Sequence, residues 1–199
     1  MGPKLRLHRN SQKRYYIDDA IYFITTNTYN GYPYLKIDIL CELFAYEIET
    51  YKQINEFKIH GYKINPEHIH LLIEPYGKCN YSQIIRSLKS NFARNANRVL
   101  GYEKLFITSK AGSRDPAFVE HVRLLQKSCD QFIKQFGVNH NIPKFKWQSS
   151  FYDHIIRDDF DYLQHLKYIQ NQWIKHKLPS NKWCWVIGEN KEGNLNEYI

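Results

Sequence analysis

The spacing of apolar and polar residues along the first half of the chain predicts a strand, a helix and then two more strands. Residues 21–27 (IYFITTN) are β-branched and aromatic, which is typical of a strand, and turn-forming residues follow them. Apolar side chains recur at helical spacing over residues 37–51 and predict an amphipathic helix. Residues 57–64 and 68–74 predict two strands that form a hairpin around Asn65-Pro66-Glu67, because proline is excluded from a central ladder but can begin a turn.

The second half of the chain predicts two helices, a short strand and a last helix. An apolar stripe at helical spacing indicates a helix over residues 80–100. A further helix is expected over 116–136, with Asp115 as its N-cap and Gly137 just beyond its end. Residues 151–157 predict a short strand. The last helix, 159–176, is expected to be buried through four apolar side chains: Leu163, Leu166, Ile169 and Trp173.

The order of these elements predicts an α+β fold. It contains the β-α-β-β-α-β order of a ferredoxin-like antiparallel sheet covered by helices, with an extra helix inserted at about 103–146 and a C-terminal helix. Residues 1–14 carry five basic residues and no acidic one, so we expect a mobile basic arm followed by one domain over 15–199.

The charge balance favours a polyanionic partner. Lys and Arg total 28 against 20 for Asp and Glu, which gives a formal net charge of +8, and aromatic residues reach 16%. Cations interleaved with aromatic rings suit binding to nucleic acid, although packing explains most of the rings. The helix over 80–100 carries four cations without an acidic neighbour in the helix, and they either contact phosphates or form a solvated face: Arg86, Lys89, Arg94 and Arg98.

Cysteine usage and hydropathy set several protein classes aside. The four cysteines include no C-x-x-C pair, which argues against a zinc ribbon and a disulfide scaffold and favours a reducing cytoplasm. No apolar run approaches the roughly 18 residues that span a bilayer, and the N-terminal residues lack the apolar segment of a signal peptide. We therefore expect neither a membrane protein nor a secreted one.

Two pairs of residues are candidates for chemistry. His68 and His70 lie on a predicted strand, where the period of two directs both imidazoles to one face and allows them to clamp a divalent ion. Tyr168 and Gln172 stand four residues apart on the last helix, with Tyr168 off the apolar stripe. Taken alone, these residues are better explained as structural histidines and an ordinary surface tyrosine.

Three segments together resemble the single-tyrosine HUH transposases, with the REP-associated tyrosine transposases as the nearest branch. Residues 64–72 match the family form M-P-N-H-V-H-L-L, and Ser87–Ser90 match its S-L-K-S segment. Residues 147–178 resemble its closing element, W-Q-x-x-(Y/F)-x-D-H-x-I-R followed by Y-I-x-x-N-P-x-K-H-G-L. The resemblance covers well over half of the chain.

The resemblance implies a metal-dependent endonuclease and strand transferase that cuts and rejoins single-stranded DNA near hairpins. It implies His68, His70 and Gln172 as ligands of Mg²⁺ or Mn²⁺, and Tyr168 as the nucleophile that forms a 5′-phosphotyrosine. Lys175 and His176 are further candidates for DNA contact, or form a solvated helix end. The relatives include monomers and homodimers.

The chain departs from the family pattern at the last helix. Gln172-Trp173 replaces Asn-Pro, which keeps an amide oxygen but drops the proline, and Lys177 replaces a glycine. Two rival functions therefore stand beside the transposase: a module that binds DNA hairpins without cutting them, and a metal-dependent hydrolase that uses water and can dispense with Tyr168.

Overall fold

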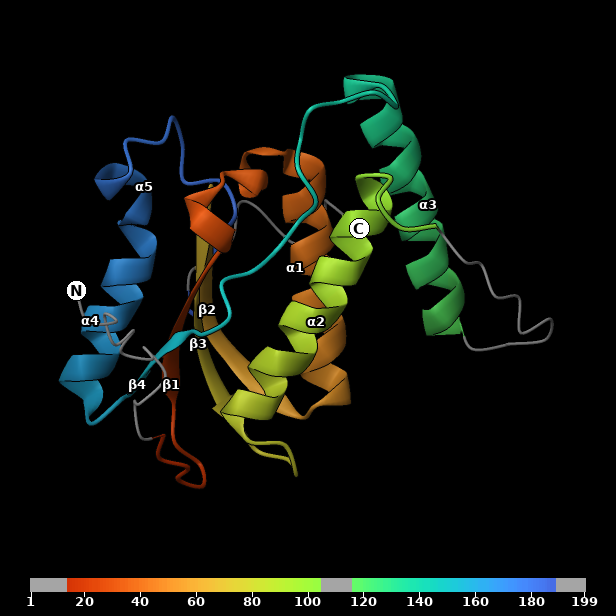
Figure 1. Ribbon diagram of the computed structural model, residues 1–199. Helices are drawn as coiled ribbons and strands as arrows, with labels where there is room; N and C mark the ends of the chain where they lie inside the picture. Colours follow the sequence, from red (N-terminus) through yellow and green to blue (C-terminus); the bar gives the residue numbers. More distant parts are fainter. Residues whose placement is uncertain (1–13, 105–115, 189–199) are drawn as a thin grey trace, which may run out of the picture.

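The computed structural model describes residues 14–104 and 116–188, which form one five-stranded antiparallel sheet in the order β4-β1-β3-β2-β5 (Figure 1). The strands are β1 (Tyr22–Asn27), β2 (Phe57–Asn65), β3 (His68–Pro75), β4 (Tyr152–Ile155) and β5 (Cys184–Val186). Helix α1 (Asp38–Ile54) joins β1 to β2, and α2 (Tyr81–Val99) follows β3. The predicted α+β class and the β-α-β-β-α-β order are confirmed.

Helices cover the sheet on both faces. Figure 1 shows α1 and α2 on one face, with the inserted helix α3 (Pro116–Phe136) packed outside them. Helix α4 (Asp159–Gln170) and the short α5 (Gln172–Lys175), both drawn in blue, lie on the opposite face. Two 3-10 turns, Tyr29–Gly31 and Tyr34–Lys36, join β1 to α1. The central strands are therefore buried between two helical layers.

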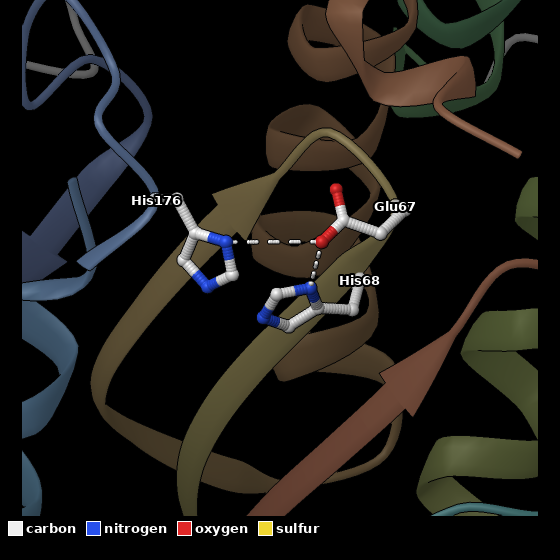
Figure 2. Close-up of side chains that lie close together, drawn as sticks. All are labelled: Glu67, His68 and His176. Carbon is white, nitrogen blue, oxygen red and sulfur yellow. Dashed lines mark hydrogen bonds and ion pairs between the residues drawn. The ribbon is translucent and has the colours of Figure 1, made fainter. Parts of the chain in front are cut away.

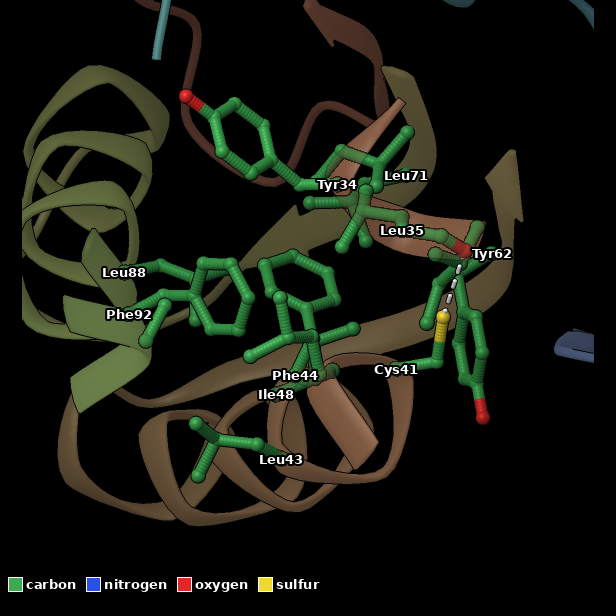
Figure 3. Packing of buried hydrophobic residues seen from close by; sticks show 14 of the residues in the cluster. Tyr34, Leu35, Cys41, Leu43, Phe44, Ile48, Tyr62, Leu71, Leu88 and Phe92 are labelled. Atoms are coloured by element: carbon green, nitrogen blue, oxygen red, sulfur yellow. Dashed lines mark hydrogen bonds between the residues drawn. The ribbon is translucent and has the colours of Figure 1, made fainter. Parts of the chain in front are cut away.

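The larger apolar core lies between the sheet and the helices α1 and α2. Phe44 of α1 and Phe92 of α2 are both fully buried and meet edge to face at 4.9 Å between ring centroids (Figure 3). On the other face a smaller cluster joins α4 to the sheet, and its fully buried members are Phe23, Leu72, Ile169 and Val186. Successive side chains of a strand point to opposite faces of the sheet, so each strand contributes apolar residues to both clusters. Leu71 lies in the larger cluster and the adjacent Leu72 in the smaller one.

The inserted helix packs within the chain. The middle of its predicted seam is buried against α1 and α2 through Leu125, Cys129 and Phe132, whereas Phe118 near its start is 42% exposed. Gly137 follows its last residue with φ +74°, a left-handed conformation that suits glycine at a helix end. The predicted N-cap Asp115 and the predicted loop 110–114 lie outside the described residues.

Four expectations need correction. The helix predicted over 159–176 is interrupted at Asn171, and Leu163 is 54% exposed instead of buried, because α4 covers the sheet mainly through Ile169. Strand β5 was not predicted; it has three residues and pairs with β2 at the sheet edge. Arg14, assigned to the basic arm, packs on the domain with its guanidinium 3.8 Å from the centroid of the Phe151 ring. The rest of the arm lies outside the described residues.

Candidate active site

His68 and His70 lie side by side on β3, the central strand of the sheet. Their Nε2 atoms are 3.1 Å apart, and both residues are less than 10% exposed. Each Nδ1 has a separate partner, because His68 Nδ1 lies 3.0 Å from the Glu67 carboxylate and His70 Nδ1 lies 2.9 Å from the Thr25 hydroxyl. Donation from Nδ1 to these oxygens leaves a lone pair on each Nε2, as in metal-binding histidines, and the Asn65 amide nitrogen also lies 3.0 Å from His68 Nε2.

Burial keeps both imidazoles neutral. It lowers the pKa of His70 to about 3, with a further contribution from the neighbouring His68. Burial also lowers the pKa of His68, although the Glu67 carboxylate acts in the opposite direction. Neutral imidazole is the form that binds a metal, so both side chains are ready to act as ligands at neutral pH.

The break between α4 and α5 positions a third polar group at the two histidines. Gln172 begins α5, is 1% exposed, and its Nε2 donates a hydrogen bond of 3.1 Å to the backbone carbonyl of Tyr168. This bond orients the amide so that Oε1 lies 3.2 Å from His70 Nε2. Two imidazole nitrogens and one amide oxygen thus converge, and an oxygen or nitrogen triad of this kind fits a divalent cation.

Tyr168 lies beside this triad but remains accessible. Its ring is 38% exposed and stands edge-on to His70, with 5.2 Å between ring centroids. Lys175 Nζ donates a hydrogen bond of 3.0 Å to the phenol oxygen. Both side chains line a groove of about 530 Å³ that also reaches Gln172 and Phe23. The four residues that sequence motifs single out, His68, His70, Tyr168 and Gln172, therefore meet in one place.

The structure adds Glu67 and Thr25, which the sequence did not indicate, and places the candidate His176 beside Glu67 with its Nε2 buried, so His176 does not form a solvated helix end. Figure 2 shows the Glu67 carboxylate between two histidines, 3.0 Å from His68 Nδ1 and 3.9 Å from His176 Nδ1. His176 Nε2 is buried and has no hydrogen-bond partner among the described residues. Glu67 lies in the hairpin turn next to His68, and this position in the sequence is the one feature that could have indicated a role for it at the site. The role of Thr25 depends on its cross-strand position opposite His70, which sequence does not reveal.

The four cations of α2 do not share one surface. Arg86 and Lys89 line a groove of about 1090 Å³ between α2 and residues 145–151, which we call the basic groove. Arg98 instead donates a hydrogen bond of 2.8 Å to Asn95, and Arg94 lies 3.4 Å from Asn91 on the same helix. The predicted basic face is therefore divided, and only its first half faces the groove.

The basic groove combines cations with exposed rings. Its lining includes Arg14, Tyr29, Arg86, Lys89, Lys146 and Trp147. Lys89 donates hydrogen bonds to the backbone carbonyls of Gln148 and Ser150, and burial lowers the pKa of its ammonium to about 8. At one end of the groove the Gln148 side chain accepts a hydrogen bond of 3.2 Å from Asn27, whose cross-strand partner is His68. The groove thus leads toward the histidine pair.

Comparisons with known proteins identify relatives of this chain. Residues 21–109 match the family described as transposase IS200-like. Over 135 residues the chain is 32% identical to a Haemophilus influenzae protein provisionally named a REP-associated tyrosine transposase. The match covers 64% of this chain, and the chain spans 57% of the length of that relative. The resemblance that the motifs predicted is thereby confirmed.

A solved structure shares the fold. It is that of a REP-associated tyrosine transposase bound to a REP hairpin, with a TM-score of 0.51 at 22% identity, covering 82% of this chain and 72% of the other. Within residues 14–104 and 116–188, no helix combines the length and the apolar character that crossing a bilayer requires.

Proposed function

We propose that this relative of the IS200-like transposases cuts and rejoins single-stranded DNA beside a hairpin, with Tyr168 as its nucleophile. The observation that carries the proposal is the position of the Tyr168 ring, which is accessible and in contact with His70 at the point where three metal-ligand atoms converge. A surface tyrosine without such a neighbour would have no means of activating a phosphodiester.

The ligands proposed for Mg²⁺ or Mn²⁺ are His68, His70 and Gln172. Their fit to a cation rests on their spacing, because His70 Nε2 lies 3.1 Å from His68 Nε2 and 3.2 Å from Gln172 Oε1, and one ion could bind all three atoms. When bound, such an ion supplies Lewis-acid activation of the scissile phosphate and orients the leaving 3′ oxygen. Glu67 would hold the His68 ring in place through the Nδ1 proton.

Tyr168 would perform the covalent step. Its phenol oxygen loses its proton and attacks phosphorus, the bond from phosphorus to the 3′ oxygen breaks, and the 3′ oxygen takes up a proton in exchange for the one that the phenol released. The product is a 5′-phosphotyrosine and a free 3′ hydroxyl, and attack by a 3′ hydroxyl on the phosphotyrosine reverses the reaction without ATP. Lys175 donates to the phenol oxygen, so its ammonium would stabilise the phenolate that forms when the phenol loses its proton before attack.

The DNA would lie across the basic groove and enter the active site from its Gln148 end. Arg86 and Lys146 are exposed there and can contact phosphates, and the ring of Tyr29 is 52% exposed and can stack on an unpaired base. The solved relative bound to a REP hairpin supports a hairpin as the partner. Because the candidate ligands and the tyrosine meet within one chain, we propose that one protomer suffices for cleavage.

The test of this proposal is the covalent intermediate. The protein is incubated with Mn²⁺ and hairpin oligonucleotides labelled on either side of the break, and the products are separated by denaturing electrophoresis. We expect a protein adduct that carries the label 3′ of the break, and its loss in Tyr168→Phe. Tyr152→Phe is the matched control, because Tyr152 is a surface tyrosine that is 53% exposed on β4.

The outcomes separate the rival functions. Cleavage that persists in Tyr168→Phe would show that water is the nucleophile. Hairpin binding without any cleavage by the parent protein would show a DNA-binding module. In His70→Ala we expect cleavage to be lost and hairpin affinity to be retained, because phosphate contacts elsewhere supply most of the affinity.

A further inference from the structure

A second group of ligand-type side chains lies at the start of α4, next to the candidate active site, and its His165 lines the same groove as Tyr168. His154 on β4 and two residues of the helix, Asp161 and His165, bring imidazole nitrogens and a carboxylate oxygen within 4.8 Å of one another. His154 Nε2 is 2.8 Å from Asp161 Oδ2, and His165 Nδ1 is 3.0 Å from Asp161 Oδ1 and 2.8 Å from the backbone carbonyl oxygen of Asp161. The two imidazole rings are nearly parallel, with 4.8 Å between their centroids.

These separations suit a small divalent ion. Nitrogen and oxygen ligands that lie about 2.1 Å from a Zn²⁺ ion are about 3.0 to 3.4 Å apart in octahedral or tetrahedral geometry. The observed separations of 2.8 and 3.0 Å therefore need only a small expansion, with the ion in place of the protons that now link the side chains. Each side chain is 20% exposed, so an ion can enter from solvent and water can complete its coordination.

The ligand set indicates which ion fits. Two imidazoles and one carboxylate favour ions such as Zn²⁺, Co²⁺ and Ni²⁺ over Mg²⁺, which prefers oxygen ligands. A support for the carboxylate is also present, because the backbone N–H of Arg157 donates a hydrogen bond of 3.1 Å to Asp161 Oδ2. Such outer contacts orient metal ligands in known sites.

We propose that His154, Asp161 and His165 form a binding site for a divalent ion of the zinc type, separate from the candidate active site. Phe23 lies between the two sites, with its ring centroid 4.6 Å from His165 and 5.2 Å from His70. The ion ties β4 to the first two turns of α4, the helix that carries Tyr168. This inference depends on the geometry of the cluster and does not require that the protein cuts DNA.

The experiment uses the full chain with His68→Ala and His70→Ala, which removes the other site. Co²⁺ is added and its visible absorption recorded, and Zn²⁺ is then used to displace it. We expect one strongly bound ion. Adding Asp161→Asn should weaken binding by at least about 100-fold, since loss of a ligand costs no less than loss of an outer contact. Asp159→Asn is the matched control, because Asp159 lies in the same first turn and is exposed.

The results decide between an ion site and a simple hydrogen-bonded cluster. Equal affinities in the Asp161→Asn and Asp159→Asn proteins, or no binding of Co²⁺ and Zn²⁺ at millimolar concentration before either change, would overturn the proposal. His165→Gln provides a second variant if Asp161→Asn fails to fold, and it should lose the ion in the same way. DNA cleavage is not a readout here, so its absence leaves the result unchanged.

Discussion

Replacing Glu47 by glutamine should stabilise the protein in a pH-dependent way. Glu47 lies on α1 and is fully buried, and its Oε1 accepts a hydrogen bond of 2.7 Å from Asn95 on α2. Its Oε2 has no hydrogen-bond partner among the described residues. Burial, partly offset by the Asn95 hydrogen bond and by nearby arginines, raises the pKa of the carboxyl to about 8. Asn95 also lies 3.4 Å from His121, so this cluster helps to hold α3 on the domain.

The sign and size of the effect follow from proton linkage. Between pH 4.5 and about 8 the folded protein keeps a proton on Glu47 that the unfolded chain releases, so the stability that this group contributes falls as pH rises. Each pKa unit corresponds to about 1.4 kcal/mol, and from pH 5 to pH 8 the parent should lose about 3 to 4 kcal/mol relative to Glu47→Gln. Glutamine retains the acceptor for Asn95 and cannot ionise.

Urea unfolding of both proteins at pH 5, 6, 7 and 8 measures this difference. Glu49→Gln is the matched control, because Glu49 lies two residues away on α1 and is only partly buried. The free energies of unfolding of Glu47→Gln and the parent should diverge as pH rises, while those of Glu49→Gln and the parent remain parallel. Parallel curves for both variants would refute the argument that Glu47 is buried in its protonated form.

Three further predictions concern the site, the groove and the sheet. Burial holds the pKa of His70 at about 3, so this site should still bind Mn²⁺ below pH 6.5, where a solvent-exposed histidine site releases its ion. Calorimetric titration at several pH values measures the affinity for Mn²⁺. Loss of half of that affinity at pH 6.5 would contradict the prediction. Arg86→Ala should reduce the slope of log affinity against log salt concentration, measured with single-stranded DNA, by about 0.7. Lys134→Ala, on α3, is the control, and an equal change in slope for it would show that DNA does not bind specifically in the basic groove. Gly61→Ala should lower the free energy of unfolding in urea by about 1 to 3 kcal/mol, because the new methyl group would lie 3.0 Å from Val186 Cγ1 and 3.1 Å from the backbone oxygen of Trp185. An unchanged urea midpoint of unfolding would refute this.

The order of elements was predictable because each has a strong period of its own. The alternation around His68 and His70 predicts two imidazoles on one face of a strand, and the structure places them there. The helix starts were also readable: α2 begins after Asn80, whose side chain forms a capping box with Gln83. Residues that are close together in the sequence determine these features, so they can be predicted from one sequence.

Features that depend on distant contacts were not predictable. No glycine or proline marks the interruption at Asn171, after which Gln172 is buried beside His70 while Tyr168, in the same groove, is 38% exposed. The β5 strand is defined by its pairing with β2, and the position of Thr25 by strand register. The roles assigned to the site residues stay predictions until the adduct is sought.

The unequal cores on the two faces of the sheet affect how the protein opens. Helix α4 is held to the sheet by a small cluster that includes Ile169, whereas α1 and α2 share the large core with the strands. Local unfolding begins where few apolar contacts hold an element, so we expect the amide hydrogens of α4 to exchange before those of α1 and α2. In the proposed reaction, a DNA end attached to Tyr168 would travel with this helix while His68 and His70 stay fixed on the central strand. Tyr168 and the histidine pair belong to parts of the molecule with different local stability.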